Sequence, residues 1–299
     1  MLTPDQIRSF HENGFLNDQI RVLTDYQLSA LRERLDAVLE GKSEAPPEAL
    51  RNLTGGSLKS DRVVVQIVNI WQADDLFRAH LCNPTVLECM AQLMDADTIR
   101  VWHDQVQYKP PVIGTATGWH QDYPAWPILE PADLISCWVA LDDATLENGC
   151  MRMVPGSHKW GTHRPLGSGE NFDPAYEPAG LPEGAAVEVV PIEVPAGCAA
   201  FHHSLTWHGS APNPSEKHRR AIAVHYMPGH TRYVPHGSHL IQNRVEVEPG
   251  EILTGQFFPT VYENGHPVPP EAIRSPEGPP PTHNEFLDLS YTKEAAATA

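Results

Sequence analysis

The sequence has no long apolar run. No stretch approaches the roughly 20 consecutive apolar residues that span a bilayer, and the first residues lack the basic and apolar regions of a secretion signal. These absences predict a chain with no membrane segment and a cytoplasmic location.

The sequence has few cysteines, and their spacing forms no paired motif. There are five, an odd number, and no Cys-x-x-Cys pair occurs. This excludes both a disulfide framework and a zinc knuckle, so we expect the cysteines to be small buried hydrophobic residues.

Basic residues are in short supply. The chain has 21 Lys and Arg against 38 Asp and Glu, and its formal net charge is −17. A nucleic-acid partner is disfavoured because it requires a basic face. A highly anionic substrate such as an acyl-CoA is also disfavoured, unless a local basic pocket offsets the overall field.

What the sequence does contain is typical of one large β-rich domain. Its 299 residues can bury a substantial core, and its 29 Pro and 21 Gly indicate many turns. Capping residues and apolar periodicity predict helices early in the chain, at residues 4–13, 25–40 and 84–94. Residues 42–56 resemble a loop, and 62–71 a strand.

From residue 98 onward, short apolar strands alternate with turn signals. We expect strands at residues 99–109, 134–141, 150–154, 187–194, 198–201 and 221–227. Such a series predicts a β-barrel or jelly roll. We therefore expect a single domain over 1–264, in which 1–97 is mostly helical support and 98–264 is the β-barrel core. The Pro- and Ala-rich residues 265–299 are expected to form a tail.

The run His120-Gln121-Asp122 is the strongest candidate for chemistry. In an extended strand, residues two apart project from the same face, so this imidazole and carboxylate can converge on one metal ion. A second, distant His completes the 2-His-1-carboxylate set that binds one face of Fe(II) and leaves three positions open. His208, in Trp207-His208-Gly209-Ser210, is the best candidate, with His202 and His203 as nearby alternatives.

Several separated motifs resemble the phytanoyl-CoA dioxygenase family of Fe(II)- and 2-oxoglutarate-dependent oxygenases. In chain order they are Tyr108-Lys109-Pro110-Pro111, Trp119-His120-Gln121-Asp122, Cys137-Trp138-Val139-Ala140-Leu141-Asp142-Asp143, Glu147-Asn148-Gly149-Cys150 with Val154-Pro155-Gly156-Ser157-His158, and His208-Gly209-Ser210 followed by Arg219-Arg220. The resemblance covers roughly residues 1–262. It implies a mainly β fold, a double-stranded β-helix with supporting N-terminal α-helices, and iron held by His120, Asp122 and His208.

The resemblance also implies a site for 2-oxoglutarate, whose distal carboxylate requires a cation deep in the barrel. Arg219 matches the family's position for that role, and an arginine suits it because its planar fork binds a carboxylate through two hydrogen bonds. Arg219 shares its face with the small residues Ala221 and Ala223, which would leave room for a ligand. Arg220 is the alternative and remains open at this stage.

Three further residues are candidates for contacts with 2-oxoglutarate. Ser210 resembles the hydroxyl partner of the same carboxylate, and Trp138 resembles an aromatic wall of the cosubstrate pocket. Gln107 is on the strand before the His-x-Asp run and could donate a hydrogen bond to the cosubstrate.

The sequence thus predicts an enzyme that uses Fe(II), 2-oxoglutarate and O2 to hydroxylate a small organic molecule, lipid-like or a secondary metabolite. The carboxylate of Asp122 separates it from related halogenating enzymes, which carry a small residue there. Two alternatives remain: a non-redox cupin-type enzyme such as an isomerase, and a silent sensor or scaffold. Tyr123, Trp126, His103 and Trp160 are candidates for the mouth of the site, and residues 161–184 for a lid. The sequence does not indicate an oligomeric state.

Overall fold

The computed structural model describes the chain except for residues 44, 55–56, 163–180, 186, 277–282 and 285–299. Most of the expected lid and much of the expected C-terminal tail lie outside the described residues. The division of the chain at residues 97 and 264 stays a prediction.

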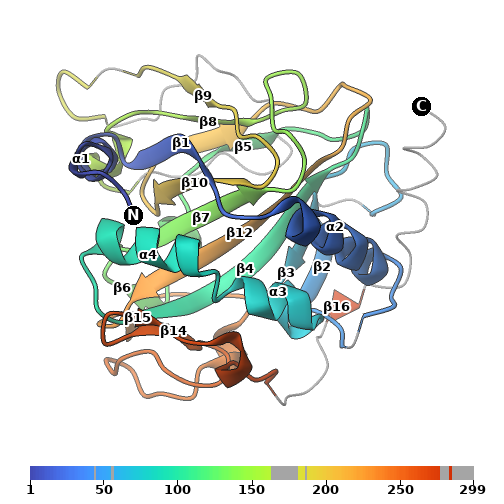
Figure 1. Ribbon diagram of the computed structural model, residues 1–299. Helices are drawn as coiled ribbons and strands as arrows, with labels where there is room; N and C mark the ends of the chain where they lie inside the picture. The colour runs from blue at the N-terminus through green and yellow to red at the C-terminus, as the bar shows by residue number, and fades with distance from the viewer. Residues whose placement is uncertain (44, 55–56, 163–180, 186, 277–282, 285–299) are drawn as a thin grey trace.

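Two antiparallel sheets form the body of the protein (Figure 1). The larger contains, in spatial order, β1 (Phe15–Arg21), β10 (Cys198–His203), β7 (Ile135–Ala140), β12 (Arg219–Pro228), β4 (Ile99–Lys109), β3 (Val65–Val68), β2 (Ala49–Asn52) and β16 (His283–Asn284), with β14 (Thr260–Glu263) and β15 (His266–Pro267) beside β4. The smaller contains β5 (Thr117–His120), β11 (His208–Ser210), β8 (Met151–Met153) and β9 (Val190–Ile192). A separate ribbon pairs β13 (Arg232–Tyr233) with β6 (Leu129–Glu130). Among the described strand pairs only β16–β2 is parallel. The mainly β, double-stranded β-helix fold is confirmed.

Four α-helices accompany the sheets: α1 (Pro4–Asn13), α2 (Asp25–Leu39), α3 (Asp75–His80) and α4 (Pro84–Met94). Thr3 and Thr24 cap α1 and α2 through capping boxes, in which the threonine hydroxyl accepts from the backbone N–H of Gln6 or Gln27. The helices expected from these signals are confirmed. Short 3₁₀ helices are η1 (Ile70–Gln72), η2 (Tyr123–Ala125), η3 (Ser157–Lys159), η4 (Gln242–Arg244) and η5 (Pro270–Ala272).

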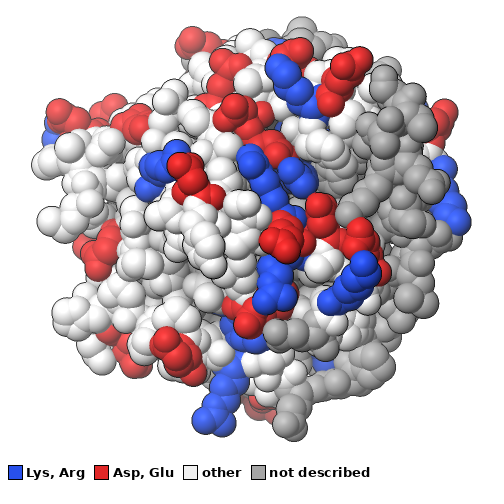
Figure 2. Space-filling view, turned by 45° about the vertical axis from the view of Figure 1, so that its right-hand side comes forward, with Lys and Arg blue, Asp and Glu red and all other residues white. Residues whose placement is uncertain are grey.

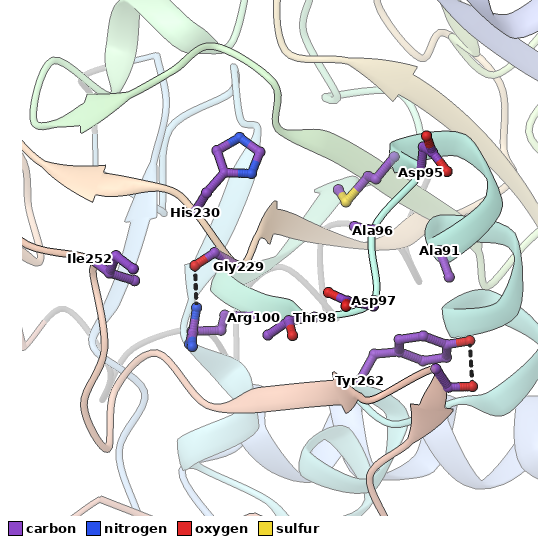
Figure 3. A pocket seen from close by; sticks show the side chains of 12 residues that line it. Ala91, Asp95, Ala96, Asp97, Thr98, Arg100, Gly229, His230, Ile252 and Tyr262 are labelled. Atoms are coloured by element: carbon purple, nitrogen blue, oxygen red, sulfur yellow. Dashed lines mark hydrogen bonds between the residues drawn. The ribbon is translucent and has the colours of Figure 1, made fainter.

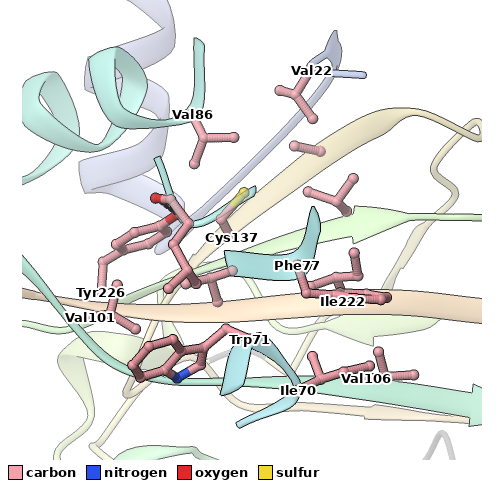
Figure 4. Packing of buried hydrophobic residues seen from close by; sticks show 14 of the residues in the cluster. Val22, Ile70, Trp71, Phe77, Val86, Val101, Val106, Cys137, Ile222 and Tyr226 are labelled. Atoms are coloured by element: carbon pink, nitrogen blue, oxygen red, sulfur yellow. Dashed lines mark hydrogen bonds between the residues drawn. The ribbon is translucent and has the colours of Figure 1, made fainter. Parts of the chain in front are cut away.

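The principal core lies between α2, α3, α4 and the outer face of the larger sheet. Alternate residues of the strands point into it, such as Val106 on β4, Cys137 on β7 and Ile222 on β12 (Figure 4). Phe77 and Val86 cover them from the helices. All five cysteines are free and buried, as expected from the sequence.

The side chain of Leu35 in α2 is fully buried in this core. We expect Leu35→Ala to lower the free energy of unfolding by about 2–5 kcal/mol, because it removes buried methyl groups and leaves a cavity. Tyr26→Ala, on the same helix but 83% exposed, should change it by less than about 0.5 kcal/mol. Denaturant titration of both variants measures the difference, and equal effects would place Leu35 outside the core.

Several short elements were absent from the sequence expectations, among them β6, β13 and β14 and, within the expected tail, β15 and β16. Strand β2 lies inside the segment expected to be a loop, and β1 and α3 were not anticipated. The expected strand over 62–71 is shorter, because the chain leaves β3 after Val68 and turns through Asn69, whose φ is +52°, into η1. Each of these elements is short, and the pairing of β1 and β2 with distant strands supplies what local pattern does not.

The inner face of the larger sheet is polar where it faces the smaller sheet. His103, Gln105, Gln107 and Lys109 alternate along β4, and Arg219, Ala221, Ala223 and His225 alternate along the adjacent β12. Side chains two apart in a strand share a face, so these two rows lie together. Met151 and Met153 of the smaller sheet pack against Trp138 and the two alanines, which closes the barrel around the row.

Candidate metal centre

Three side chains converge between the smaller sheet and the inner face of the larger sheet. His120 ends β5 and His208 begins β11, and the two are direct partners in the β5–β11 ladder. Asp122 lies with its Oδ1 3.7 Å from the Nε2 of each histidine. One ligand atom from each residue lies within 4.8 Å of the others, and this is the only such group of His, Cys, Asp or Glu found among the described residues.

The convergence of His120 and Asp122 differs from the sequence expectation. We expected both on one strand, but β5 ends at His120, and Asp122 has helical dihedral angles (φ −71°, ψ −45°) at the start of η2. Between them, the buried Gln121 donates hydrogen bonds to the carbonyls of Gly161 and Leu205. The tertiary hydrogen bonds of Gln121 thus hold a turn at this point, and the turn brings the carboxylate back to the imidazoles.

Both histidines have a defined orientation. Nδ1 of His120 lies 2.8 Å from the carbonyl of Gly118, and Nδ1 of His208 lies 2.8 Å from the carbonyl of Thr206. A carbonyl only accepts, so each Nδ1 carries the proton and each Nε2 presents its lone pair toward Asp122. Burial, and next the neighbouring His120, hold the pKa of His208 well below its ordinary value. A neutral imidazole is the form that binds a metal.

The second oxygen of Asp122 is held by protein groups. His202 Nε2 and Ser136 Oγ each lie 3.1 Å from Oδ2. Burial opposes ionisation of Asp122, but His208 and His202 outweigh it and keep its pKa well below its ordinary value. The carboxylate therefore stays charged, with Oδ1 directed at the two histidines.

His202 and His203, the alternatives to His208, make other contacts. His202 contacts the far oxygen of Asp122 rather than the group of three. His203 points elsewhere, where its Nδ1 accepts the backbone N–H of Leu205. The position of His208 thus agrees with the preference drawn from the sequence.

Two buried basic side chains lie deeper in the barrel. Arg219 is 1% exposed and Lys109 is fully buried, and they are direct partners in the β12–β4 ladder. Among the described residues no carboxylate forms an ion pair with either side chain. Burial lowers the pKa of Arg219 to about 10, so its guanidinium stays charged at neutral pH, and its Nε is buried without a hydrogen-bond partner.

Arg220 has a different environment. It faces away from the barrel interior and binds Asp142 through two hydrogen bonds, Nε to Oδ2 at 2.8 Å and Nη2 to Oδ1 at 2.9 Å. Its charge is already neutralised there. Of the two neighbouring arginines, Arg219 alone lies on the inner face.

The other expected contacts also line this interior. The Trp138 ring lies 4.9 Å beneath the Arg219 guanidinium, and its buried Nε1 has no partner. Ser210 accepts a 2.6 Å hydrogen bond from Lys109 Nζ. Gln107 lines the cavity. Lys109 was missed as a site residue; its period-two spacing from Gln105 and Gln107 was the available signal.

Two cavities meet at His120 and Asp122, and the inner one also reaches His208. A narrow inner cavity of about 20 Å³ reaches Trp138 and Ser210, and an outer chamber of about 320 Å³ reaches Arg51, Trp126 and His239. Of the residues expected at the mouth, His103 and Trp126 line the chamber. Tyr123 and Trp160 do not; the Tyr123 hydroxyl donates to the Leu129 carbonyl, and Trp160 packs against Trp119, Val154 and Trp207.

A larger hollow of about 750 Å³ lies elsewhere, beside the end of α4 and the start of β4 (Figure 3). Asp95, Asp97 and His230 line it, and Arg100 donates a hydrogen bond to the carbonyl of Gly229. It shares no lining residue with the chamber at the three ligand side chains. Size alone therefore does not identify the site.

Figure 2 shows one face of the described surface. Basic and acidic side chains lie next to one another there without a continuous basic patch. No described helix has the length and apolar character to cross a membrane. The expected cytoplasmic location stays a prediction.

A double-stranded β-helix with two histidines and one carboxylate meeting at its centre defines the class: a barrel protein with a facial metal site open on one side. The chain belongs to the phytanoyl-CoA dioxygenase (PhyH) family, whose family model matches residues 10–221.

Individual relatives agree with this assignment. The chain is 27% identical over 250 residues to a probable phytanoyl-CoA dioxygenase of Caenorhabditis elegans, covering 76% of this chain and 75% of that protein. Over 140 residues it is 33% identical to a probable alpha-ketoglutarate-dependent hypophosphite dioxygenase of Stutzerimonas stutzeri, covering 44% and 46% of the two chains. The solved structure of SnoK, a non-haem alpha-ketoglutarate-dependent carbocyclase from nogalamycin biosynthesis, matches with a TM-score of 0.71 and 27% identity over 87% of this chain and 96% of that one.

Proposed function

We propose that this protein is an Fe(II)- and 2-oxoglutarate-dependent dioxygenase that hydroxylates a small organic substrate and releases succinate and CO2. The observation that carries the proposal is the convergence of His120, Asp122 and His208 beside the buried guanidinium of Arg219, which has no ion-pair partner among the described residues. The first feature suits the iron, and the second suits the dicarboxylate cosubstrate.

The donor set fits Fe(II). Two neutral imidazole nitrogens and one carboxylate oxygen are ligands that non-haem iron accepts, and three protein ligands leave room for cosubstrate and O2. When bound, the iron would activate O2 for attack on a C–H bond, with 2-oxoglutarate as the reductant that is converted to succinate and CO2. The protein positions the ligands: Gly118 and Thr206 orient the imidazoles, and His202 and Ser136 orient the carboxylate.

The interior also fits 2-oxoglutarate. Arg219 Nε and Trp138 Nε1 are buried donors without partners. A buried donor left unpaired costs about 1–3 kcal/mol, and more for a charged group. A carboxylate placed between them removes this cost and neutralises Arg219. We assign the distal carboxylate of 2-oxoglutarate to this position.

Lys109 prepares Ser210 for the same carboxylate. Its Nζ has only hydrogens to give, and it donates to Ser210 Oγ as well as to the carbonyls of Ser210 and Ala211. The lone pair of Oγ is therefore used, and the hydroxyl hydrogen is available for an acceptor in the inner cavity. Lys109 acts as a positioning residue through these hydrogen bonds, while burial, and next Arg219, hold its pKa well below the ordinary value.

The carboxylate at Asp122 supports oxygenation rather than halogenation, since a halide requires the ligand position that Oδ1 occupies. A cupin-type isomerase has no need of the buried group formed by Arg219, Lys109 and Ser210. A silent sensor has no reason to keep the full set of ligands together with this group. These three observations favour the oxygenase over the alternatives drawn from the sequence.

Anaerobic reconstitution tests the proposal. Adding Fe(II) and then 2-oxoglutarate should produce the weak visible charge-transfer band of a metal-bound keto acid, and Fe(II) with succinate should not. If the folded, iron-loaded protein shows no band, the proposed function is wrong. Mass spectrometry of candidate substrates then distinguishes hydroxylation, a gain of one oxygen coupled to succinate, from another oxidation that removes two hydrogens.

A further inference from the structure

A chain of five hydrogen bonds crosses the inner face of the larger sheet, from the chamber mouth to the candidate metal ligand Asp122. Arg51 Nε donates to Gln66 Oε1 at 2.7 Å, and Gln66 Nε2 donates to Gln105 Oε1. Gln105 Nε2 lies 3.1 Å from His225 Nε2. Finally, Ser136 Oγ lies 2.6 Å from His225 Nδ1 and 3.1 Å from Asp122 Oδ2.

The two ends set the direction of every bond. A guanidinium only donates and an ionised carboxylate only accepts. Each amide in between accepts on its oxygen and donates from its nitrogen, so His225 accepts at Nε2 and carries its proton on Nδ1. Ser136 Oγ accepts a hydrogen bond from this Nδ1–H and donates its hydroxyl hydrogen to Asp122 Oδ2. No link in the chain competes with another, so the side-chain positions are mutually reinforced.

Arg51 is the end of this chain that faces the chamber. Only its Nε is engaged; among the described residues, none makes a hydrogen bond or ion pair with its two terminal nitrogens. Of the described residues that line the outer chamber, Arg51 is the only Lys or Arg and Asp122 the only Asp or Glu. Asp122 is held at the candidate metal position, so the charge of Arg51 is without a counterion.

The side chains that line the chamber between Arg51 and the candidate metal ligands have aromatic rings, and these rings are uncharged. His103 and His225 have ring centroids 4.6 Å apart, and Trp126 lies 4.8 Å from His225. Burial, and next the nearby His239, lower the pKa of His103 to about 3. Burial, and next Arg51, lower the pKa of His239 to about 4. At neutral pH these imidazoles therefore offer flat apolar faces and single hydrogen bonds.

We propose that the outer chamber binds a small organic acid: its carboxylate is held by the terminal nitrogens of Arg51, and its hydrocarbon part lies against the rings beside the three ligand side chains. The planar fork of an arginine fixed at Nε matches a carboxylate end-on. A volume of about 320 Å³ is at the lower end of the range for small-molecule sites. This inference rests on the proposed function, because it names the substrate class of the same site.

Arg219 and Arg51 then bind different ligands. Arg219 is buried behind the ligand side chains and suits the cosubstrate, whereas Arg51 is exposed at the mouth and suits a molecule that enters and leaves in each turnover. The net charge of −17 opposes a polyanion such as an acyl-CoA. A single local arginine balances one carboxylate and no more.

Isothermal titration tests the assignment with 3-phenylpropanoate and the matched neutral 3-phenylpropanamide as probes. The protein is equilibrated anaerobically with Fe(II) and 2-oxoglutarate. We expect the acid to bind at least about tenfold more tightly than the amide, as a charge-assisted pair predicts. In Arg51→Gln the acid should lose that advantage, and Arg51→Lys should recover only part of it because the fork is lost.

Arg8→Gln is the matched control, since it removes the same charge from an exposed helix position paired with Asp5. It should leave the affinity for the acid unchanged. Equal binding of acid and amide, no binding of the acid, or an unchanged acid affinity in Arg51→Gln would overturn the proposal. So would a loss of 2-oxoglutarate affinity in Arg51→Gln, which would assign Arg51 to the cosubstrate. Failure of the proposed function is separate: the charge-transfer band is then missing from the wild-type protein, whichever probe binds.

Discussion

His208→Ala should lose its bound iron and reduce succinate formation to background. One of three ligands is removed, and the loss in metal affinity should exceed the roughly 10–100-fold that the removal of an outer hydrogen-bond partner costs. His120→Ala and Asp122→Ala should behave alike, because each supplies an equivalent share of the coordination. Iron content after anaerobic desalting and succinate release measure the two effects together.

Two neighbouring histidines serve as controls. His203→Ala removes an imidazole that contacts the backbone of Leu205, so iron content should remain at the wild-type level. His202→Ala removes the partner of Asp122 Oδ2, and iron affinity should fall by about 10–100-fold without being abolished. Full activity in His208→Ala would refute its assignment as a ligand.

Arg219→Ala should raise the concentration of 2-oxoglutarate needed for the half-maximal charge-transfer band by about 10–100-fold, with iron still bound. The reason is the loss of charge-assisted hydrogen bonds in a buried site, which are worth roughly 1.5–3 kcal/mol. The measurement is a 2-oxoglutarate titration of the charge-transfer band alongside the iron content.

Arg220→Ala removes the same charge one residue away. It breaks the ion pair with Asp142, so the midpoint of thermal unfolding should fall while the affinity for 2-oxoglutarate stays the same. The two variants therefore separate a ligand contact from a structural one. An unchanged 2-oxoglutarate affinity in Arg219→Ala would move the carboxylate position away from this side chain.

Local patterns were enough for the long elements and for separating the two faces of β12. Capping boxes at Thr3 and Thr24 set the starts of α1 and α2, because these signals are satisfied within a few residues. The alternation of Arg219, Ala221 and Ala223 against Ile222 and Val224 already separated an inner face from an outer one. The structure places Arg219 inside and Arg220 against Asp142 accordingly.

The short elements and the shape of the site depended on distant contacts. Strand β2 forms because it pairs with β3, and no local pattern within residues 42–56 predicts it. The geometry at Asp122 depends on Gln121 binding the carbonyls of Gly161 and Leu205, 40 and 84 residues away. A period-two rule cannot anticipate such a turn, because the turn is set by partners outside the local window.

The sequence by itself determined the class of ligand atoms, the strand alternation and the surplus of acid, since these are properties of residue type and spacing. Only the tertiary structure decided that Lys109 lies beside Arg219 and that no described carboxylate pairs with either. It also decided that Arg51 faces the chamber and is linked to Asp122 by hydrogen bonds through Gln66, Gln105, His225 and Ser136. Those side chains come from β2, β3, β4, β7 and β12 and from the turn at Asp122. Their meeting is fixed by the order and register of strands in the sheet, which is a property of the whole chain.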